Sequence, residues 1–305
     1  LRENVHLLPP VEEHSLTPDF RVLDEQEAML LRRRVLDRVL EDFYAHIEED
    51  GNARQLAETL GAGRDDRALE ALVLDLHEKT QSHPHPLRWL ELLSRNANDR
   101  FDADFWARRL TRAVEDMADY PAVYKAYGDR FLEVAQGLEA LRDKAAGGWD
   151  SLAQGVPSFR RMGVAKGEEN AACRERAKAV LEQAKKALKD IQAIFSVPEA
   201  ELLEDLRQMA PAMLALLRLT AQFTLHYQAE KVRRNVMDFS DQEHYAIDLL
   251  TDGQGRPTEL AKQVSSRYRE VMVDEYQDSN QVQNCIFRAL SGEERRLFAV
   301  GDVKQ

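Results

Sequence analysis

Apolar residues recur at helical spacing along most of this chain, which has 305 residues. The first such stripe contains Ala28, Leu31, Val35, Val39 and Phe43. Intervals of three and four residues place these side chains on one face of an α-helix. Similar stripes occupy residues 69–76, 103–145, 171–195 and 199–230. The chain is therefore predicted to be mostly α-helical.

Local signals indicate where several of these helices begin and end. Asp24 followed by Glu27 is typical of a capping box, in which the Asp side chain accepts from first-turn amides. The prolines at 82–86 (Ser-His-Pro-His-Pro) end the second helix. Residues 196–198 end in a proline that suits the start of the next helix. The glycine-rich residues 147–170 show little periodicity and are predicted to form a loop or hinge.

The pattern changes at about residue 236. Ser240 and Glu243 have the spacing of a second capping box, ahead of a short helix. Short apolar runs then occupy 271–273 and 297–300, and a helical stripe lies between them. Each run ends in acidic residues, so strand, helix and strand predict a small parallel α/β portion. Parallel sheets of this kind place ligands at the carboxyl ends of their strands.

Composition excludes several classes of protein. A transmembrane helix needs about 20 apolar residues, and no apolar run here exceeds a few, so no contact with a membrane is expected. Cys173 and Cys285 are too few for a disulfide scaffold and fit a reducing, cytoplasmic setting. The 42 Lys and Arg against 54 Asp and Glu give a net charge of −12. That balance argues against a surface that coats nucleic acid everywhere, because phosphate binding depends on Lys and Arg.

Asp274 and Glu275 directly follow the first predicted strand. An NTPase uses such a pair to hold magnesium and to orient water against a phosphoryl group. Asp274 would bind Mg²⁺, since hard cations prefer oxygen ligands, and Glu275 would polarise the attacking water. The alternative is a strand end followed by a helix capped by Asp278 or Ser279, with incidental acids nearby.

Two segments carry a resemblance to a known family. Residues 274–280 (Asp-Glu-Tyr-Gln-Asp-Ser-Asn) resemble motif II of superfamily 1 helicases of the UvrD/Rep/RecB kind. Residues 300–305 (Val-Gly-Asp-Val-Lys-Gln) resemble motif III of the same group, with Asp302 lying 28 residues after Asp274. Two linked motifs, each at a predicted strand end, favour this family strongly over incidental acids.

Further segments narrow the resemblance to the AddA subunits of bacterial AddAB helicase–nucleases, with RecB as a cousin. The motif III sequence, residues 19–27 and residues 82–90 are similar to AddA segments. Residues 237–241 match the segment before motif II, although Gln242 replaces the usual Leu. Residues 1–8 resemble the chain just after motif Ib. The resemblance therefore extends over essentially the whole chain.

The resemblance implies a domain plan and an activity. Residues 1–18 would be a remnant of the helicase core after motif Ib, residues 19–235 the helical 1B insertion domain, and residues 236–305 part of the RecA-like 1A core. The parent would be an ATP-dependent DNA helicase of 3′–5′ polarity with exonuclease activity. It would process double-strand DNA ends for recombinational repair, with an AddB-type partner subunit.

The resemblance also implies roles for individual residues. Asp274 would bind Mg²⁺ and the nucleotide, and Glu275 would be the general base. Gln305 would sense the γ-phosphate of ATP and couple it to DNA. Gln277 and Asp278 belong to motif II, and we expect a local structural role for both.

Departures from the family pattern limit what this chain can do alone. No Gly-x-x-x-x-Gly-Lys-[Ser/Thr] motif occurs in it, and that loop is what cradles the phosphates. The motor arginines and nuclease motifs of the family are absent too. We therefore expect a fragment, comprising domain 1B and an edge of domain 1A, without ATPase, helicase or nuclease activity of its own.

Other interpretations stay open. The helical body could be a module that binds DNA or a partner without catalysis, and the parent could be a RecB/UvrD-type helicase without a nuclease. Basic clusters, including one at Lys231, Arg233 and Arg234, are interpreted first as solvated faces. Arg160 and Arg161 are the favoured candidates for phosphate contacts. His83 and His85 indicate a helix end followed by a proline start more than a metal pair.

Overall fold

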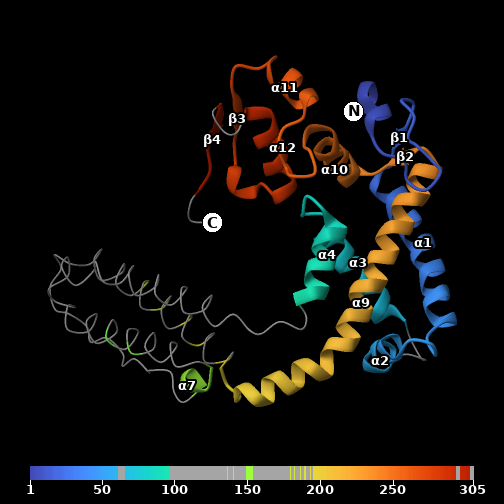
Figure 1. Cartoon of the computed structure of the whole chain (residues 1–305), viewed down its shortest axis with the longest axis vertical. Helices are drawn as coiled ribbons and strands as arrows, with labels where there is room; N and C mark the ends of the chain where they lie inside the picture. Colours follow the sequence, from blue (N-terminus) through green and yellow to red (C-terminus); the bar gives the residue numbers. More distant parts are fainter. Residues whose placement is uncertain are drawn as a thin grey trace. The chain divides into compact units, whose positions relative to one another are not determined.

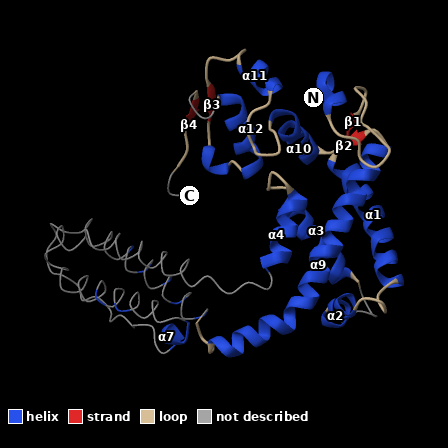
Figure 2. Ribbon diagram, in the orientation of Figure 1, coloured by secondary structure: helices blue, strands red, loops and turns tan. Residues whose placement is uncertain are grey.

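The computed structural model describes residues 1–60, 66–96, 149–153, 195–292 and 296–302, with single helical positions between 136 and 193. The chain divides into two compact units, the first formed by residues 1–98 and 209–305 and the second by residues 99–208. Helices dominate the described residues, as predicted, and the strands are short (Figure 1, Figure 2). Within these ranges no helix is long and apolar enough to cross a membrane.

A helical body makes up much of the first unit. Its elements are α1 (Glu25–Ala45), α2 (Gly51–Thr59), α3 (Arg67–Thr80), α4 (Pro86–Asn96) and the second half of α9 (Glu199–Arg233). In Figure 1 the long α9 runs beside α1 and α3. Leu36, Val73 and Phe223 from these three helices share one core and are almost completely buried. The apolar stripe predicted for α1 is thus the face that packs into this core.

The two predicted capping boxes have different outcomes. Asp24 caps α1, and its Oδ1 accepts from the Glu27 amide at 2.8 Å, which confirms the first. The second prediction is wrong by two residues, because Asp238 and not Ser240 caps α10 (Phe239–Leu250). Asp238 accepts from the Asp241 amide at 3.0 Å, and Asp241 accepts from the Asp238 amide at 2.9 Å. Two aspartates therefore make the reciprocal pair that a Ser and a Glu would otherwise make.

Two very short strands join distant parts of the chain. β1 (Arg21–Val22) pairs in parallel with β2 (Val236–Met237). Asn235, just before β2, has the left-handed backbone φ of 52°. Its side chain accepts from the Thr17 amide at 2.9 Å and donates to Asp19 at 3.2 Å. The entry to α1 and the exit from α9 are thereby held side by side.

The carboxyl-terminal part has the predicted strand–helix–strand order. It comprises α10, α11 (Glu259–Ser265), β3 (Val271–Val273), the 3₁₀ turn η3 (Tyr276–Asp278), α12 (Gln281–Ser291) and β4 (Leu297–Ala299). β3 and β4 are parallel and in register, with Met272 opposite Phe298. Asn280, rather than Asp278 or Ser279, caps α12 by accepting from the Gln283 amide at 2.8 Å. η3 takes up the residues that could otherwise have been the cap.

The second unit is described around α7 (Trp149–Ala153) and the start of α9. α7 lies within the stretch predicted to be a loop at 147–170, so that prediction is wrong for these five residues. Trp149 is buried against Phe195 and donates from its indole nitrogen to the Val197 carbonyl at 2.7 Å. Asp150 accepts from the Glu199 amide at 2.8 Å, at the first residue of α9. The packing and hydrogen bond of Trp149 thus stabilise the start of the short helix α7.

Candidate functional site

The acidic pair lies where two parallel strands end. Backbone bonds continue past both strands, with the Val300 amide donating to the Val273 carbonyl at 2.9 Å and the Tyr276 amide donating to the Val300 carbonyl at 2.8 Å. Asp274 and Glu275 therefore lie at the same sheet edge as Gly301 and Asp302. The two motifs that were recognised separately in the sequence meet at this edge, and both acids are exposed there.

Glu275 occupies a strained backbone conformation. Its φ of 50° and ψ of 43° lie in the left-handed region, which is uncommon for residues other than glycine. Such a conformation costs about 1–3 kcal/mol and persists only where surrounding contacts impose it. Here the Glu275 carbonyl accepts from the Asp278 amide at 2.9 Å and closes the η3 turn. The strain coincides with the residue that was expected to act as general base.

Asp274 has one carboxylate oxygen that accepts a local hydrogen bond and a second oxygen that could bind a cation. Its Oδ1 accepts from the Glu275 amide at 3.0 Å, and its exposed side chain leaves the other oxygen at the strand edge. The described residues hold no group of three side chains that could bind a metal by themselves. Mg²⁺ in nucleotide sites usually takes one or two carboxylates, with phosphate oxygens and water as its other ligands. The single carboxylate is therefore compatible with magnesium that arrives with a nucleotide.

Gln277 connects the two motifs, which the sequence did not reveal. Its Oε1 accepts from the Asp302 amide at 2.9 Å, while its Nε2 donates to the Glu275 carboxylate. The expected local structural role thus extends to a contact with the second motif. Gln305, Arg160 and Arg161 lie outside the described residues.

A family model describes almost the whole chain. The UvrD/REP helicase N-terminal domain matches residues 3–305. The chain belongs to this helicase family. Among curated relatives, an ATP-dependent helicase/nuclease subunit of Lachnoclostridium phytofermentans is 33% identical over 95% of this chain and 23% of the relative. The equivalent subunits of Desulforamulus reducens and Geobacillus kaustophilus are 32% and 31% identical, each over 95% of this chain and over 25% and 26% of the relatives. The chain thus spans about a quarter of the length of these relatives.

A second polar cluster is buried beneath α10. Lys231 is only 4% exposed, so its interpretation as part of a solvated face is wrong. Its ammonium lies 3.0 Å from Asp238 and 2.7 Å from Asp241. Burial raises the pKa of Asp238, but the Lys231 charge and hydrogen bonds from Asp241, Lys231 and Tyr227 outweigh it and hold that pKa at about 2. The two aspartates of the α10 cap are thus also the counterions of a buried lysine.

Arg233, the last residue of α9, and Arg234, just after it, both bind Glu230. The Arg233 and Arg234 guanidinium groups donate to the Glu230 carboxylate, each at 2.8 Å. Hydrogen bonds from Arg233 and Arg234, with the charges of both, lower the pKa of Glu230 to about 2, although burial opposes them. These two arginines therefore neutralise a buried acid in the last turn of α9.

The loop between α3 and α4 contacts α10 and the start of α12. α3 ends at Thr80 and α4 begins at Pro86, so the predicted helix end and proline start are confirmed. His83 stacks on Trp89 with ring centroids 4.3 Å apart, and its Nδ1 lies 3.2 Å from Gln281 Oε1 at the start of α12. His244 of α10 lies 3.0 Å from the His83 carbonyl oxygen. These contacts give His83 a packing role and no metal-binding partner among the described residues.

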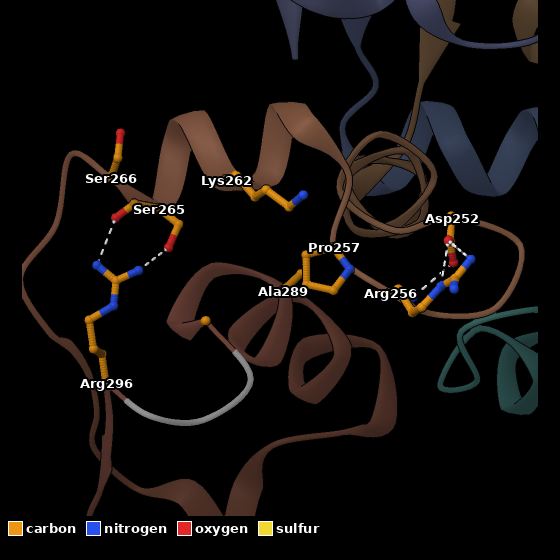
Figure 3. Close-up of a pocket in the computed structure, with 9 residues that line it drawn as sticks. Asp252, Arg256, Pro257, Lys262, Ser265, Ser266, Ala289 and Arg296 are labelled. Carbon is orange, nitrogen blue, oxygen red and sulfur yellow. Dashed lines mark hydrogen bonds and ion pairs between the residues drawn. The ribbon is translucent and has the colours of Figure 1, made fainter.

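A polar cavity of about 710 Å³ lies between α11 and the end of α12 (Figure 3). Its basic side chains already have partners. Arg256 pairs with Asp252 at 2.9 Å and Lys262 with Glu259 at 2.5 Å. Arg296 donates to the carbonyls of Ser265 and Tyr268 (3.3 and 2.9 Å) and joins the start of β4 to α11. These side chains support the fold around the sheet.

Proposed function

We propose that this chain is a segment of an AddA-type subunit of an ATP-dependent helicase–nuclease. The parent would unwind and process double-strand DNA ends for recombinational repair. The observation that carries this proposal is the position of Asp274 and Glu275 at the end of β3, beside Gly301 and Asp302 at the end of parallel β4. The identity of 31–33% to helicase/nuclease subunits of three bacteria supports it.

The proposal includes the domain plan. Residues 1–18 would follow motif Ib, residues 19–235 would be the helical 1B domain and residues 236–305 part of a RecA-like 1A core. The β1–β2 pair supports these boundaries, since it lies where the helical body begins and ends. Met272 and Phe298 are register partners and exposed, and parallel sheets normally have both faces covered, so in the proposed parent another element would pack over this face.

In the proposed reaction Glu275 accepts a proton from the water that attacks the γ-phosphate of ATP. Asp274 holds Mg²⁺, which when bound neutralises charge on the phosphate oxygens. Gln305 contacts the γ-phosphate and couples it to DNA. Because this chain has no P-loop sequence, nucleotide binding depends on residues elsewhere in the parent.

Partners follow from the same proposal. They are DNA, both double-stranded ends and single strands, and an AddB-type subunit, in a cytoplasmic complex. Arg160 and Arg161 are proposed to contact DNA phosphates. The helicase would have 3′–5′ polarity and the exonuclease would lie elsewhere in the parent.

The decisive experiment uses the full-length polypeptide that contains this segment. Glu275→Gln should reduce DNA-stimulated ATP hydrolysis by about 100-fold or more, because a general base contributes about 10²–10⁴-fold. Binding of a fluorescent ATP analogue should stay within about twofold. Gln263→Asn, on α11 and remote from the site, is the control. Wild-type-like hydrolysis by Glu275→Gln would refute the proposed function.

A further inference from the structure

The Gln277 side chain has a contact at each of its two ends. Its Oε1 accepts from the Asp302 backbone amide at 2.9 Å, and its Nε2 donates to the Glu275 carboxylate. The orientation of the side-chain amide follows from chemistry. A backbone N–H can only donate, so the oxygen must face Asp302. The nitrogen must then face Glu275, whose ionised carboxylate can only accept.

Gly301 leaves the space that this arrangement needs. A Cβ added to Gly301 would lie 2.5 Å from Gln277 Oε1 and 3.1 Å from the Gln277 backbone nitrogen. Real Cβ atoms essentially never approach a heavy atom to 2.5 Å. A larger residue at position 301 would therefore push the Gln277 side chain away from Asp302.

We propose that Gln277 is a positioning residue, which holds the Glu275 carboxylate in place and links it to the segment that follows β4. This inference rests on the proposed function, because it gives Gln277 a role only if Glu275 acts as the base. Glu275 is exposed and lies in a strained turn, so its side chain has few other restraints. Through Gln277, the position of the carboxylate depends on the position of Asp302.

The link has a mechanical consequence. Asp302 lies three residues before Gln305, the residue proposed to contact the γ-phosphate. A displacement of this segment would move the Asp302 amide, and Gln277 would transmit that movement to Glu275. ATP hydrolysis would thereby be favoured only when the Asp302 amide lies within hydrogen-bonding distance of Gln277.

The test measures steady-state ATP hydrolysis by the full-length polypeptide with saturating single-stranded DNA. Gln277→Ala should lower kcat by about 10- to 100-fold. Removing the hydrogen-bond partner that orients a metal ligand typically has an effect of this size. KM for ATP and the Kd of an ATP analogue should stay within about twofold. Gln283→Ala is the matched control, because it also removes a glutamine that donates to a glutamate (Glu243, 3.0 Å). It should retain wild-type kcat.

Two further variants separate positioning from general loss of structure. Gly301→Ala should lower kcat in the same direction, and Gln277→Ala combined with Gly301→Ala should be no worse than Gln277→Ala alone.

The outcomes distinguish the two hypotheses. If Glu275→Gln abolishes hydrolysis but Gln277→Ala retains wild-type kcat, the positioning role is refuted and the proposed function stands. If Gln277→Ala loses nucleotide binding along with kcat, or its effect adds fully to that of Gly301→Ala, the positioning role is also refuted. If Glu275→Gln retains full activity, the proposed function itself fails.

Discussion

Lys231 and Asp241 form an ion pair of 2.7 Å in the interior of the first unit, and both side chains are almost completely buried. Asp241 also caps α10 together with Asp238. One lysine thus stabilises the end of the helical body and the start of the carboxyl-terminal part. Charges in such a place are tolerated only while every partner is present.

Removing this lysine should strongly destabilise the fold. Lys231→Met removes the ammonium that contacts two adjacent buried carboxylates, and we expect a loss of about 3–5 kcal/mol in the free energy of unfolding. Urea denaturation followed by circular dichroism measures it. Lys79→Met is the control, because its pair with Asp75 is exposed and contributes about 0.5 kcal/mol. Equal losses for the two variants would contradict the buried pair.

Stability should decrease as the pH drops through a window set by His77. Burial, followed by the charges of Lys231 and Arg32, lowers the pKa of His77 to about 3. The unfolded side chain titrates near 6.5, so the folded state must stay neutral while the unfolded state gains a proton. The contribution is complete above about pH 6.5 and is lost as the pH falls toward 3. His77→Gln should reduce this slope, which is at most about 1.4 kcal/mol per pH unit.

A second loss of stability should appear at lower pH. The pKa of Asp238 is lowered in the fold, so its contribution is present above the unfolded value near 3.9 and is lost as the pH falls toward 2. Denaturation midpoints between pH 5 and 2, compared with those of Asp238→Asn, measure this term. A variant with the same slope as wild type below pH 4 would contradict the assignment.

Two glycines should respond to alanine in opposite ways. Gly292 ends α12 with a φ of 68°, so Gly292→Ala should cost about 1 kcal/mol. Gly51 begins α2 without such a φ, and a Cβ there would meet nothing within 4 Å. Gly51→Ala should therefore be neutral or stabilise the chain by up to about 1 kcal/mol. Thermal denaturation of both variants tests the contrast. A Gly292→Ala variant as stable as wild type would contradict it.

The proposed DNA contact predicts a change in salt dependence. If Arg160 and Arg161 each neutralise a phosphate, the double alanine variant should bind duplex DNA more weakly. Its slope of log K against log salt should decrease in magnitude by about 2. Gel shifts across a salt series measure the slope. Arg256→Ala, which removes an arginine paired with Asp252, is the control. An unchanged slope would exclude these two arginines.

The sequence predicted the features that depend on local chain chemistry. The stripe of α1 and its Asp24 cap follow from spacing within a few residues, and the parallel pair β3–β4 follows from two short apolar runs separated by a helical stripe. The burial of Lys231 did not, because it depends on aspartates from the next element that fold over it. The spacing favoured Ser240 as the cap of α10. Asp238 is the cap instead, and the buried Lys231 also binds its carboxylate. The bridge made by Gln277 was not predicted either, because it joins the turn after β3 to the segment after β4.

The β1–β2 pair also constrains the order in which the chain can fold. Each strand has two residues, and the two strands come from opposite ends of the helical body. Their few backbone hydrogen bonds cannot offset the conformational entropy lost on closing the long loop between them. α1 and α9 must therefore dock first through the core they share with α3, and only then can Arg21 and Val236 meet. Such long-range pairing is slow to form. The two strands are therefore expected to pair last. The amide protons of Arg21 and Leu23, which donate across this pair, should exchange with solvent whenever α1 and α9 separate.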